Sequence, residues 1–458
     1  MYGGKSSVEL EKQLICLIFA HSKSGIEYKD DEFLNKYYLI KQPKALKLLL
    51  TLFYNKETIN FLINLCKFSP INSYVCRSAQ LDVFVLEKLF NLRTTDNVNT
   101  FELLLKLFSE IGRVNSAVSV VNQYISLFTA INGKFISRYQ LMLISALEFL
   151  CENTKYNPVS ILIKATSTIS KVPAESVKKG CVVTFWMLNH SKETKNKLVD
   201  IGNVASFEIS DNKIGISYNK NSNEAVIEND DDDEDEDDND TNIDDNENEN
   251  VNSTSSFKYN KKFSDTNIPL FQWVHVSLSF KIKENKTYCF LALNGVYQEI
   301  IRIRTPLLIN DKTCDFTFYS SSKIYVGPYG IYPYFSFRKT IEKDGKKIND
   351  TNPLFTVDCR SQPKLLVKKV VKPIVYITPH SYNSTMKLEI ESSIPDIDVK
   401  LFVGQSYDII TFVDALTERC GISVLLPLFA EIDLHIYEKN EQMKYIDLLI
   451  EVIKNLFS

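Results

Sequence analysis

Two periodicities of apolar residues divide the chain into three regions. From residue 8 to residue 151, apolar side chains recur at three- and four-residue spacing, which is typical of helices with one buried face. Between about residues 170 and 340 they alternate with polar side chains, as in strands whose two faces differ. Helical spacing returns beyond Tyr407. The pattern therefore predicts a β-sandwich set between two helical segments.

The first region is expected to be a stack of helices. The predicted helices span residues 8–20, 33–41, 45–54, 59–68, 81–92, 101–111, 114–131 and 139–151. Pro43 and Pro70 lie at junctions, where proline ends one helix or opens the next. One helix per ~20 residues makes one helix pair per ~40, the period of HEAT and armadillo repeats. We expect an α-helical, armadillo/HEAT-like solenoid over residues 1–169, with a compact helical bundle as the alternative.

The central region is organised around two tryptophan-bearing strands, CVVTFWMLNH at 181–190 and QWVHVSLSFKI at 272–282. Alternation places Val183, Phe185 and Met187 on one face of the first strand and Trp186 on the other. The predicted strands are 182–188, 206–209, 214–218, 273–282, 288–293, 296–303, 315–320 and 323–327. We expect a β-sandwich over residues 170–340 in which Trp186 and Trp273 are buried on central strands.

One hairpin can be placed from its turn. Asn294-Gly295 separates two alternating runs, and this dipeptide supplies the positive φ angles that a type I′ turn requires. We expect this turn at a sheet edge.

An acidic segment interrupts the sandwich. Residues 228–249 carry 15 acidic side chains and no basic one, more than a quarter of the chain's 57 acidic residues. Like charges repel and cannot be buried, so a disordered loop is expected over residues 222–255. A calcium site of the EF-hand type is disfavoured, because the segment lacks the glycine that such a loop needs.

The last part of the chain is harder to interpret. Residues 341–404 contain several prolines and short apolar patches, and an irregular connection is expected there. Residues 405–458 are expected to form a second, incomplete helical repeat segment, with helices at 409–420, 422–432 and 443–457. The final helix has a wide apolar stripe made of Met443, Ile446, Leu449, Ile450, Ile453, Leu456 and Phe457. We expect part of this stripe to stay uncovered, and the chain to be a fragment or a truncated relative of a longer protein.

The composition indicates the class of protein and its cellular compartment. The chain has 458 residues, of which 44% are hydrophobic and 24% charged, as in ordinary globular proteins. Nine cysteines occur singly without a CxxC pair, and no secretory signal is apparent, so reduced thiols in a cytoplasmic protein are expected. The net charge of −4 hides the acidic segment, because the rest of the chain is net positive. The cations outside the acidic segment are dispersed along the chain, which disfavours nucleic acid as a partner. Peripheral association with anionic membranes remains open.

The sequence contains none of the catalytic motifs sought. It has no phosphate-binding loop, dinucleotide fingerprint, HExxH or GxSxG motif. The five histidines, His21, His190, His275, His380 and His435, stand apart from one another and from cysteine in the sequence. We therefore predict no catalytic, cofactor-binding or metal-binding residue and no cofactor.

Two alternatives were weighed against this conclusion. A glucanase would need carboxylates flanking the scissile bond, but Glu431 and Asp433 are followed by His435 where a third would stand, and Glu389 and Glu391 also lack a third member. A lectin could stack sugar on Trp186 and Trp273, although their apolar neighbours favour packing. We expect no enzyme, and we keep a carbohydrate-binding, lectin-like module as the alternative function.

The order of these parts resembles a known family. CVVTFWML, FQWVHVSLSF, LALNGVYQE and KIYVGPYG follow one another as in the concanavalin A-like (laminin-G-like) domain of BEACH-domain proteins, the neurobeachin and beige group. FVDALTERCGISVLLPLFAEID resembles the helix pair that follows that domain. The BEACH domain itself, the pleckstrin-like domain and the WD repeats are absent.

The resemblance implies an armadillo-like solenoid, a concanavalin A-like jelly-roll sandwich and a short second helical segment. It also implies a non-catalytic scaffold of membrane or vesicle trafficking, including lysosomal traffic and autophagy. Such a scaffold would be cytoplasmic and peripheral on intracellular membranes. Its partners would be proteins bound by the solenoid and the sandwich, with carbohydrate disfavoured.

Overall fold

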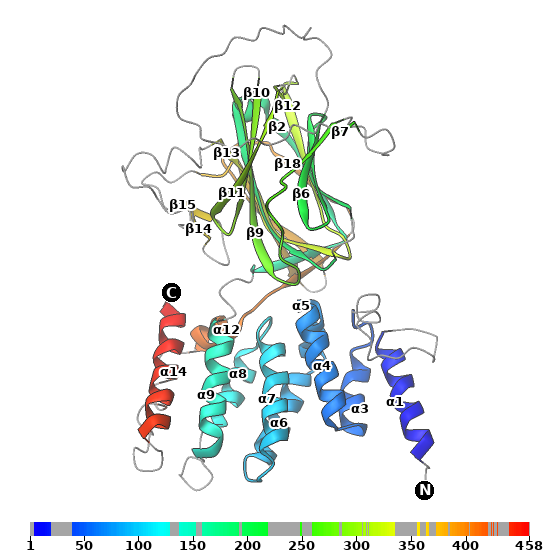
Figure 1. Cartoon of the computed structure of the whole chain (residues 1–458), viewed down its shortest axis with the longest axis vertical. Helices are drawn as coiled ribbons and strands as arrows, with labels where there is room; N and C mark the ends of the chain where they lie inside the picture. Colours follow the sequence, from blue (N-terminus) through cyan, green and yellow to red (C-terminus); the bar gives the residue numbers. More distant parts are fainter. Residues whose placement is uncertain are drawn as a thin grey trace. The chain divides into compact units, whose positions relative to one another are not determined.

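Helix packing and strand pairing divide the chain into two units. The structure, a computed structural model, describes residues 4–19, 39–128, 137–152, 158–191, 195–218, 248–249, 259–283, 286–304, 306–307, 309, 311–334, 355–357, 363–365, 372–382, 385–402, 404–419, 423, 425, 428 and 439–457. One unit, the helical unit, combines Met1–Asn157 with Ile409–Ser458, and the other, the sandwich, is Pro158–Asp408 (Figure 1). The sandwich is thus inserted within the sequence of the helical unit.

The described helices of the helical unit are α1 (Gly4–Ile18), α3 (Lys44–Leu52), α4 (Lys56–Phe68), α5 (Pro70–Ser78), α6 (Leu81–Leu92), α7 (Val98–Gly112), α8 (Val118–Ser126), α9 (Ser137–Glu152), α12 (Phe412–Arg419) and α14 (Lys439–Phe457). Their starts follow local chemistry. The Asn55 side chain accepts a hydrogen bond from the Thr58 backbone N–H at 2.8 Å and caps α4. Pro70 occupies the first turn of α5, where its missing N–H costs nothing.

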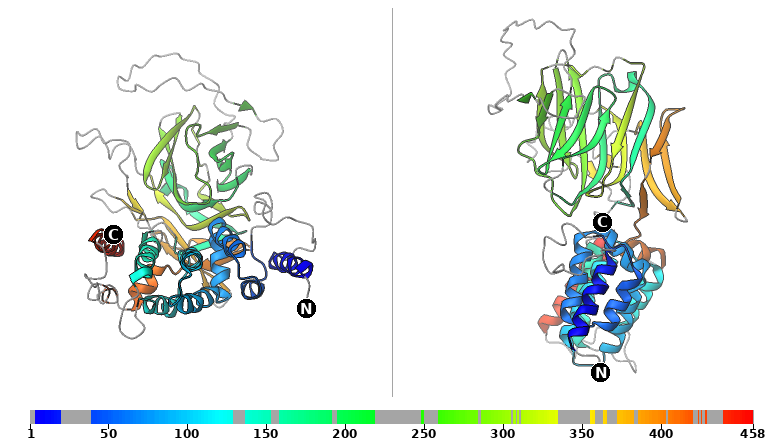
Figure 2. Two further views of the ribbon diagram at one scale, coloured as in Figure 1. Left: turned by 60° about the horizontal axis from the view of Figure 1, so that its bottom comes forward. Right: turned by 90° about the vertical axis from the view of Figure 1, so that its right-hand side faces the viewer.

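The helices lie in two rows. In one row α4 contacts α7, α7 contacts α9, and α9 contacts α14; in the other α3 contacts α6, α6 contacts α8, and α8 contacts α12. Figure 2 shows these helices from two further sides. Helix α5 was not predicted from the sequence, because it is only nine residues long and its buried side includes the polar residues Asn72 and Ser73.

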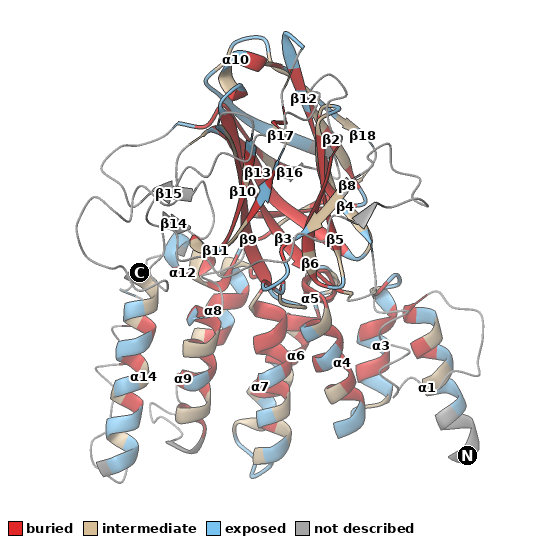
Figure 3. Cartoon of the chain, turned by 45° about the horizontal axis from the view of Figure 1, so that its top comes forward, coloured by how far each residue is buried: buried red, intermediate tan, exposed pale blue. Residues whose placement is uncertain are grey.

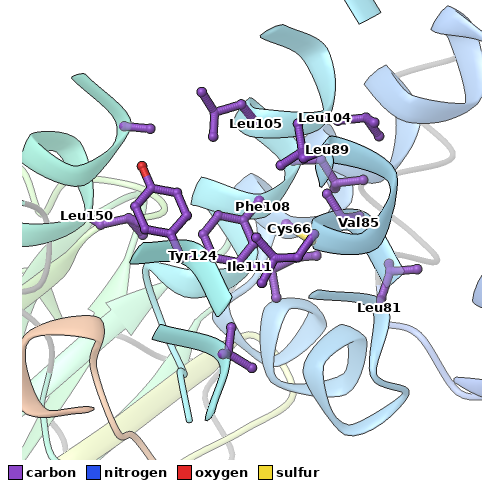
Figure 4. Packing of buried hydrophobic residues seen from close by; sticks show 14 of the residues in the cluster. Cys66, Leu81, Val85, Leu89, Leu104, Leu105, Phe108, Ile111, Tyr124 and Leu150 are labelled. Atoms are coloured by element: carbon purple, nitrogen blue, oxygen red, sulfur yellow. The ribbon is translucent and has the colours of Figure 1, made fainter. Parts of the chain in front are cut away.

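The C-terminal segment packs into the core of the N-terminal helices. The Ser116 backbone N–H donates to the Ile410 carbonyl at 2.7 Å. The Phe412 ring lies 5.6 Å from the Tyr124 ring in an edge arrangement, and Tyr124 in turn stacks on Phe108, as Figure 4 shows. On α14, Leu449 is buried in the same core. A separate helical segment was expected over residues 405–458. The structure corrects this expectation, because α12 and α14 belong to the helical unit.

The sandwich is built from two antiparallel sheets (Figure 1). The described strands are β1 (Ser160–Ile163), β2 (Thr166–Pro173), β3 (Gly180–Asn189), β4 (Asn196–Ile201), β5 (Ala205–Ser210), β6 (Lys213–Tyr218), β7 (Asn248–Glu249), β8 (Tyr259–Lys262), β9 (Trp273–Lys283), β10 (Lys286–Leu293), β11 (Val296–Ile303), β12 (Thr313–Tyr319), β13 (Ile324–Pro333), β14 (Phe355–Val357), β15 (Pro363–Leu365), β16 (Val375–Tyr382), β17 (Thr385–Ser392), β18 (Asp398–Phe402) and β19 (Gln405–Asp408), with the short helix α10 (Ala174–Val177) before β3.

The nine-stranded sheet has the order β11-β10-β9-β3-β13-β1-β19, with β16 paired to β13 and β17 to β16. The eight-stranded sheet has the order β18-β2-β12-β4-β5-β6-β8-β7. Phe185 and Met187 of β3 face a core that is shared with Phe207 and Phe316 of the other sheet. The predicted β-sandwich is confirmed, and β3 and β9 are buried along most of their length (Figure 3).

The predicted domain boundaries at residues 169 and 341 are corrected. β1 and β2 precede residue 169 and belong to the sandwich, which begins at Pro158. The expected irregular connection over residues 341–404 instead supplies β16, β17 and β18, which pair with β13, β16 and β2. β16 and β18 pair with strands far away in the sequence, so local alternation could not reveal that this segment completes the two sheets.

Several predictions fall outside the described residues. They include most of the helix expected at 33–41 and most of the helix expected at 422–432. Most of the acidic segment also lies outside, except for β7, which pairs with β8. No helix in the described part of the chain is long and apolar enough to cross a membrane.

The Asn294-Gly295 turn is confirmed between β10 and the edge strand β11. Both residues have positive φ, 50° at Asn294 and 81° at Gly295. The strands pair directly from the turn as far as Ala292, opposite Tyr297, and the register then shifts so that Leu291 lies opposite Glu299. The extra residue on β11 is a β-bulge, which exchanges the two faces of the rest of that strand.

Gly180 is expected to be indispensable for the β3–β9 pairing. Its φ is +116°, and a Cβ there would lie 2.0 Å from the Phe280 carbonyl oxygen. Gly180→Ala should therefore lower the free energy of unfolding of the sandwich by about 2–4 kcal/mol. Both tryptophans lie in the sandwich, so urea unfolding followed by tryptophan fluorescence measures this unit.

Gly202→Ala is the matched control. Gly202 also has a positive φ, +48°, but the nearest atom to its Cβ position is the Cys314 sulfur at 3.5 Å. Gly202→Ala should lower the free energy of unfolding of the sandwich by only about 1 kcal/mol. Equal losses in the two variants would contradict the steric argument.

The helical unit is expected to fold without the inserted sandwich. β1 pairs with β19 so that Ser160 lies opposite Asp408, which places the two ends of the insertion side by side. Replacing Pro158–Asp408 by about six Gly/Ser residues should preserve a monomeric helical protein. Far-UV circular dichroism and analytical ultracentrifugation would check this, and an aggregated or unfolded product would contradict it.

Candidate functional site

The tryptophan strands form the first candidate site. β3 and β9 pair so that Trp186 lies directly opposite His275 and Leu188 opposite Trp273. Trp186 is 0% exposed and Trp273 is 9% exposed, as predicted. Trp186 lies outside the core that the two sheets share, on what we call the outer face of the nine-stranded sheet. A sugar ring cannot stack on an indole that is already covered, so the described indoles do not line an open lectin groove.

A row of buried polar side chains continues along this outer face. Alternation on β9 brings Ser277 and Ser279 to the same face as His275, and Thr184 of β3 lies opposite Ser277. All four are buried. The centres of the His275 and Trp186 rings are 5.3 Å apart in an edge arrangement, with an interplanar angle of 76°. Burial lowers the pKa of His275 to about 3, so this imidazole is neutral near neutral pH. It is not poised as a general acid or base there.

Of the other histidines, the structure describes His190 and His380, which make separate contacts. The buried His190 ring packs on Tyr325 at 4.4 Å. On β16, His380 contacts Asp408 through Nδ1 and Glu389 through Nε2, both at 3.2 Å. His21 and His435 lie outside the described residues. Within the part of the chain that the structure describes, no group of three or more histidine, cysteine and acidic residues could hold a metal ion.

Of the four carboxylates considered for glycoside hydrolysis, only Glu389 and Glu391 belong to the described residues. Glu389 and Glu391 are both exposed on β17, and Glu389 contacts a histidine rather than a second carboxylate. Glu431 and Asp433 lie outside the described residues.

No disulfide joins any of the described cysteines, Cys16, Cys66, Cys76, Cys151, Cys181, Cys289 and Cys314. Cys66 of α4 and Cys76 of α5 are both buried, and their sulfur atoms are 3.7 Å apart. The hydrogen bond with Cys66 and burial raise the pKa of Cys76 well above its usual value. Buried thiols with a raised pKa are poor nucleophiles, so this pair is a packing contact.

The second candidate site is an apolar row on α14. One side of this helix, with Tyr445, Leu449 and Val452, is buried in the core of the helical unit. Met443 and Ile450 are 53% and 41% exposed, while Ile446 and Ile453 are half-buried. These four residues, which we call the α14 row, follow one another at three- and four-residue spacing and therefore share one side of the helix. The expectation that part of the final stripe stays uncovered is confirmed for this row.

The sequence singled out the stripe of α14 but could not divide it. Tyr445 and Val452 were not named from the sequence, although they pack on the core, whereas Met443 and Ile450 were named and remain open. Which residues of the stripe are covered depends on the side of α14 that contacts the neighbouring helix α9. That choice is made by packing, and the apolar periodicity alone does not reveal it.

Comparisons with known proteins do not identify the chain. No protein-family model matches it, and no curated protein matches it. Similar solved structures include a protein of Bacteroides ovatus described as a candidate carbohydrate-binding protein, which is 8% identical with a TM-score of 0.31, covering 56% of this chain and 62% of that one.

They also include a heptameric SAP-like pentraxin of Limulus polyphemus, which is 9% identical with a TM-score of 0.25, covering 52% of this chain and 97% of that one. The binding domain of botulinum neurotoxin DC, solved with rat synaptotagmin II, is 8% identical with a TM-score of 0.17, covering 57% of this chain and 79% of that one. At these identities and scores, the similarities carry no argument about function.

His275 is expected to make the stability of the sandwich depend on pH. Its pKa falls to about 3 on folding, so below about pH 6.5 the unfolded chain binds a proton that the folded imidazole does not bind. The free energy of unfolding should therefore fall as the pH decreases through that window, by about 1.4 kcal/mol per pH unit.

A His275→Gln variant removes this contribution. The stability advantage of the wild type over the variant should shrink by about 2 kcal/mol between about pH 7 and pH 5. Urea unfolding followed by tryptophan fluorescence at each pH would measure it. Parallel pH profiles of the two proteins would show that His275 is not protected from protonation.

Proposed function

We propose that this chain is a non-catalytic interaction protein that binds other proteins through its helical unit. The observation that carries the proposal is the α14 row, where Met443 and Ile450 are open to solvent on a helix whose other side is already packed. Exposed apolar side chains in a continuous row are typical of protein interaction sites.

The partner that fits the α14 row is an apolar helix of another protein. The row runs from Met443 to Ile453, a length of about 15 Å along the helix axis. Asp447 and Lys454 lie beside it and are exposed, and Lys454 also pairs with Glu451 at 2.6 Å. A partner helix with apolar residues at matching spacing would bury the row and meet these charges.

The family resemblance supplies the cellular setting of the proposal, membrane or vesicle trafficking. In support, the segments that carry the resemblance form β11, β10, β9, β3 and β13, which are consecutive in one sheet. FVDALTER forms α12, which contacts α8 and α9. We extend the proposal to the finer fold, an armadillo-like array of helices and a concanavalin A-like jelly-roll sandwich.

The test places a photo-crosslinking amino acid at Met443 in the full chain expressed in cells. We expect crosslinks to a small set of proteins, which mass spectrometry would identify. The double substitution Met443→Glu and Ile450→Glu should lower the affinity of the purified partner by about 100-fold, because two apolar anchors are replaced by charges.

The matched control is Asn440→Glu with Lys444→Gln, which changes the net charge equally at exposed positions of the same helix. It should keep most of the affinity. Unchanged affinity in the Met443/Ile450 variant would refute the α14 row as the binding site. Micromolar binding on a glycan array, without protein partners, would favour the lectin-like alternative.

A further inference from the structure

Two rows of side chains cross β9, β10 and β11 at the end of the nine-stranded sheet that lies away from the Asn294-Gly295 turn. In the first row, Tyr288 of β10 lies directly opposite Lys281 of β9 and Arg302 of β11. In the second, Lys286 of β10 lies opposite Lys283 of β9. Arg304 follows Ile303, which lies opposite Thr287, so it extends the second row. We call these six residues the basic rows.

The basic rows share the outer face. Ile282, Thr287 and Ile303 lie between them in the sequence, and Ile303 faces the core between the two sheets. Alternation therefore turns the neighbouring cations to the other face. Lys283, Lys286, Arg302 and Arg304 are exposed, whereas Lys281 and Tyr288 are half-buried. The Lys281 ammonium also lies 5.7 Å from the centre of the Tyr334 ring.

Strand pairing concentrates positive charge on this face. Lys283 and Lys286, two like charges, lie directly opposite each other on neighbouring strands. The bulge on β11 adds to the concentration of charge, because without the register shift Arg302 and Arg304 would face the core. The three adjacent strands β9, β10 and β11 thus bring five cations to the outer face. The pairing of these strands does not itself require charged residues there. A surface that gathers cations in this way attracts anions.

The size of the basic rows selects the kind of anion. Three strands about 4.8 Å apart and two rows about 7 Å apart make a patch about 10 Å wide. Arginine forms paired hydrogen bonds with phosphate oxygens, and lysine adds point charge. A patch this short fits one phosphorylated group, whereas a nucleic-acid backbone needs cations along a longer track. Tyr288, between Lys281 and Arg302, has the amphipathic ring that suits a membrane–water interface.

We propose that the basic rows bind the phosphorylated headgroup of an anionic lipid at a membrane surface. This site is separate from the α14 row, and it does not depend on the proposed protein partner. Each cation at an anionic surface contributes about fivefold in affinity, so the site as a whole supports reversible attachment that weakens with salt.

The test uses the full chain in a vesicle sedimentation assay. The vesicles contain phosphatidylcholine and phosphatidylserine, with or without phosphatidylinositol bisphosphate. We expect binding that increases with the phosphorylated lipid. Replacing Lys283, Lys286 and Arg304 by glutamine should reduce the affinity by about 100-fold. Tryptophan fluorescence unfolding would verify that the variant sandwich is folded.

The matched control replaces Lys197, Lys323 and Lys400 by glutamine. These three lysines are exposed, and their replacement removes the same amount of charge. They lie on β4, directly before β13 and on β18, away from the basic rows. The control should bind vesicles as the wild type does. Equal losses in both triple variants would overturn the proposal in favour of non-specific charge attraction, and so would wild-type binding by the Lys283/Lys286/Arg304 variant.

Two further arms separate the sources of the anion. Soluble inositol phosphate should compete for the rows but bind more weakly than vesicles. If it binds while vesicles of either composition do not, the membrane assignment is wrong. If a duplex oligonucleotide binds with the same dependence on Lys283, Lys286 and Arg304, and vesicles do not, the partner is a nucleic acid and the proposal fails.

Discussion

The pairing of β1 with β19 is the constraint on which the organisation of this protein depends. These strands are the first and last of the sandwich, and their antiparallel register places Ser160 opposite Asp408. The chain therefore leaves the sandwich beside the point where it entered. Because the ends are adjacent, a large unit can be inserted between α9 and α12 while α12 still packs on α8 and α9.

Within the sandwich, the outer face of the nine-stranded sheet changes character along β9. Near Trp186 it carries a neutral, buried histidine and buried hydroxyl groups, whereas at Lys281 and Lys283 it becomes basic and more exposed. The covered part suits a structural role, because buried aromatic and imidazole rings are held by packing. The exposed part can meet a charged ligand. One strand thus joins a structural region to a candidate binding surface.

The two candidate surfaces differ in physical kind. The α14 row is apolar and lies on a helix of the helical unit, so its contribution to binding would come from removing apolar area from water. The basic rows are cationic and lie on the sandwich, so their contribution would weaken as salt increases. A protein partner and an anionic surface could therefore be bound independently.

The sequence by itself determined the elements whose signals are local. The tryptophan strands, the Asn294-Gly295 turn and most of the N-terminal helices follow from periodicity and turn chemistry, because these signals arise from neighbouring residues. Tertiary structure alone decided which distant strands completed the sheets, which side of α14 was covered, and that the C-terminal helices return to the first unit. It also decided the bulge at Leu291, which turns Ile303 inward and Arg302 outward. These outcomes depend on partners far apart in the sequence, and packing selects among registers that are locally equivalent.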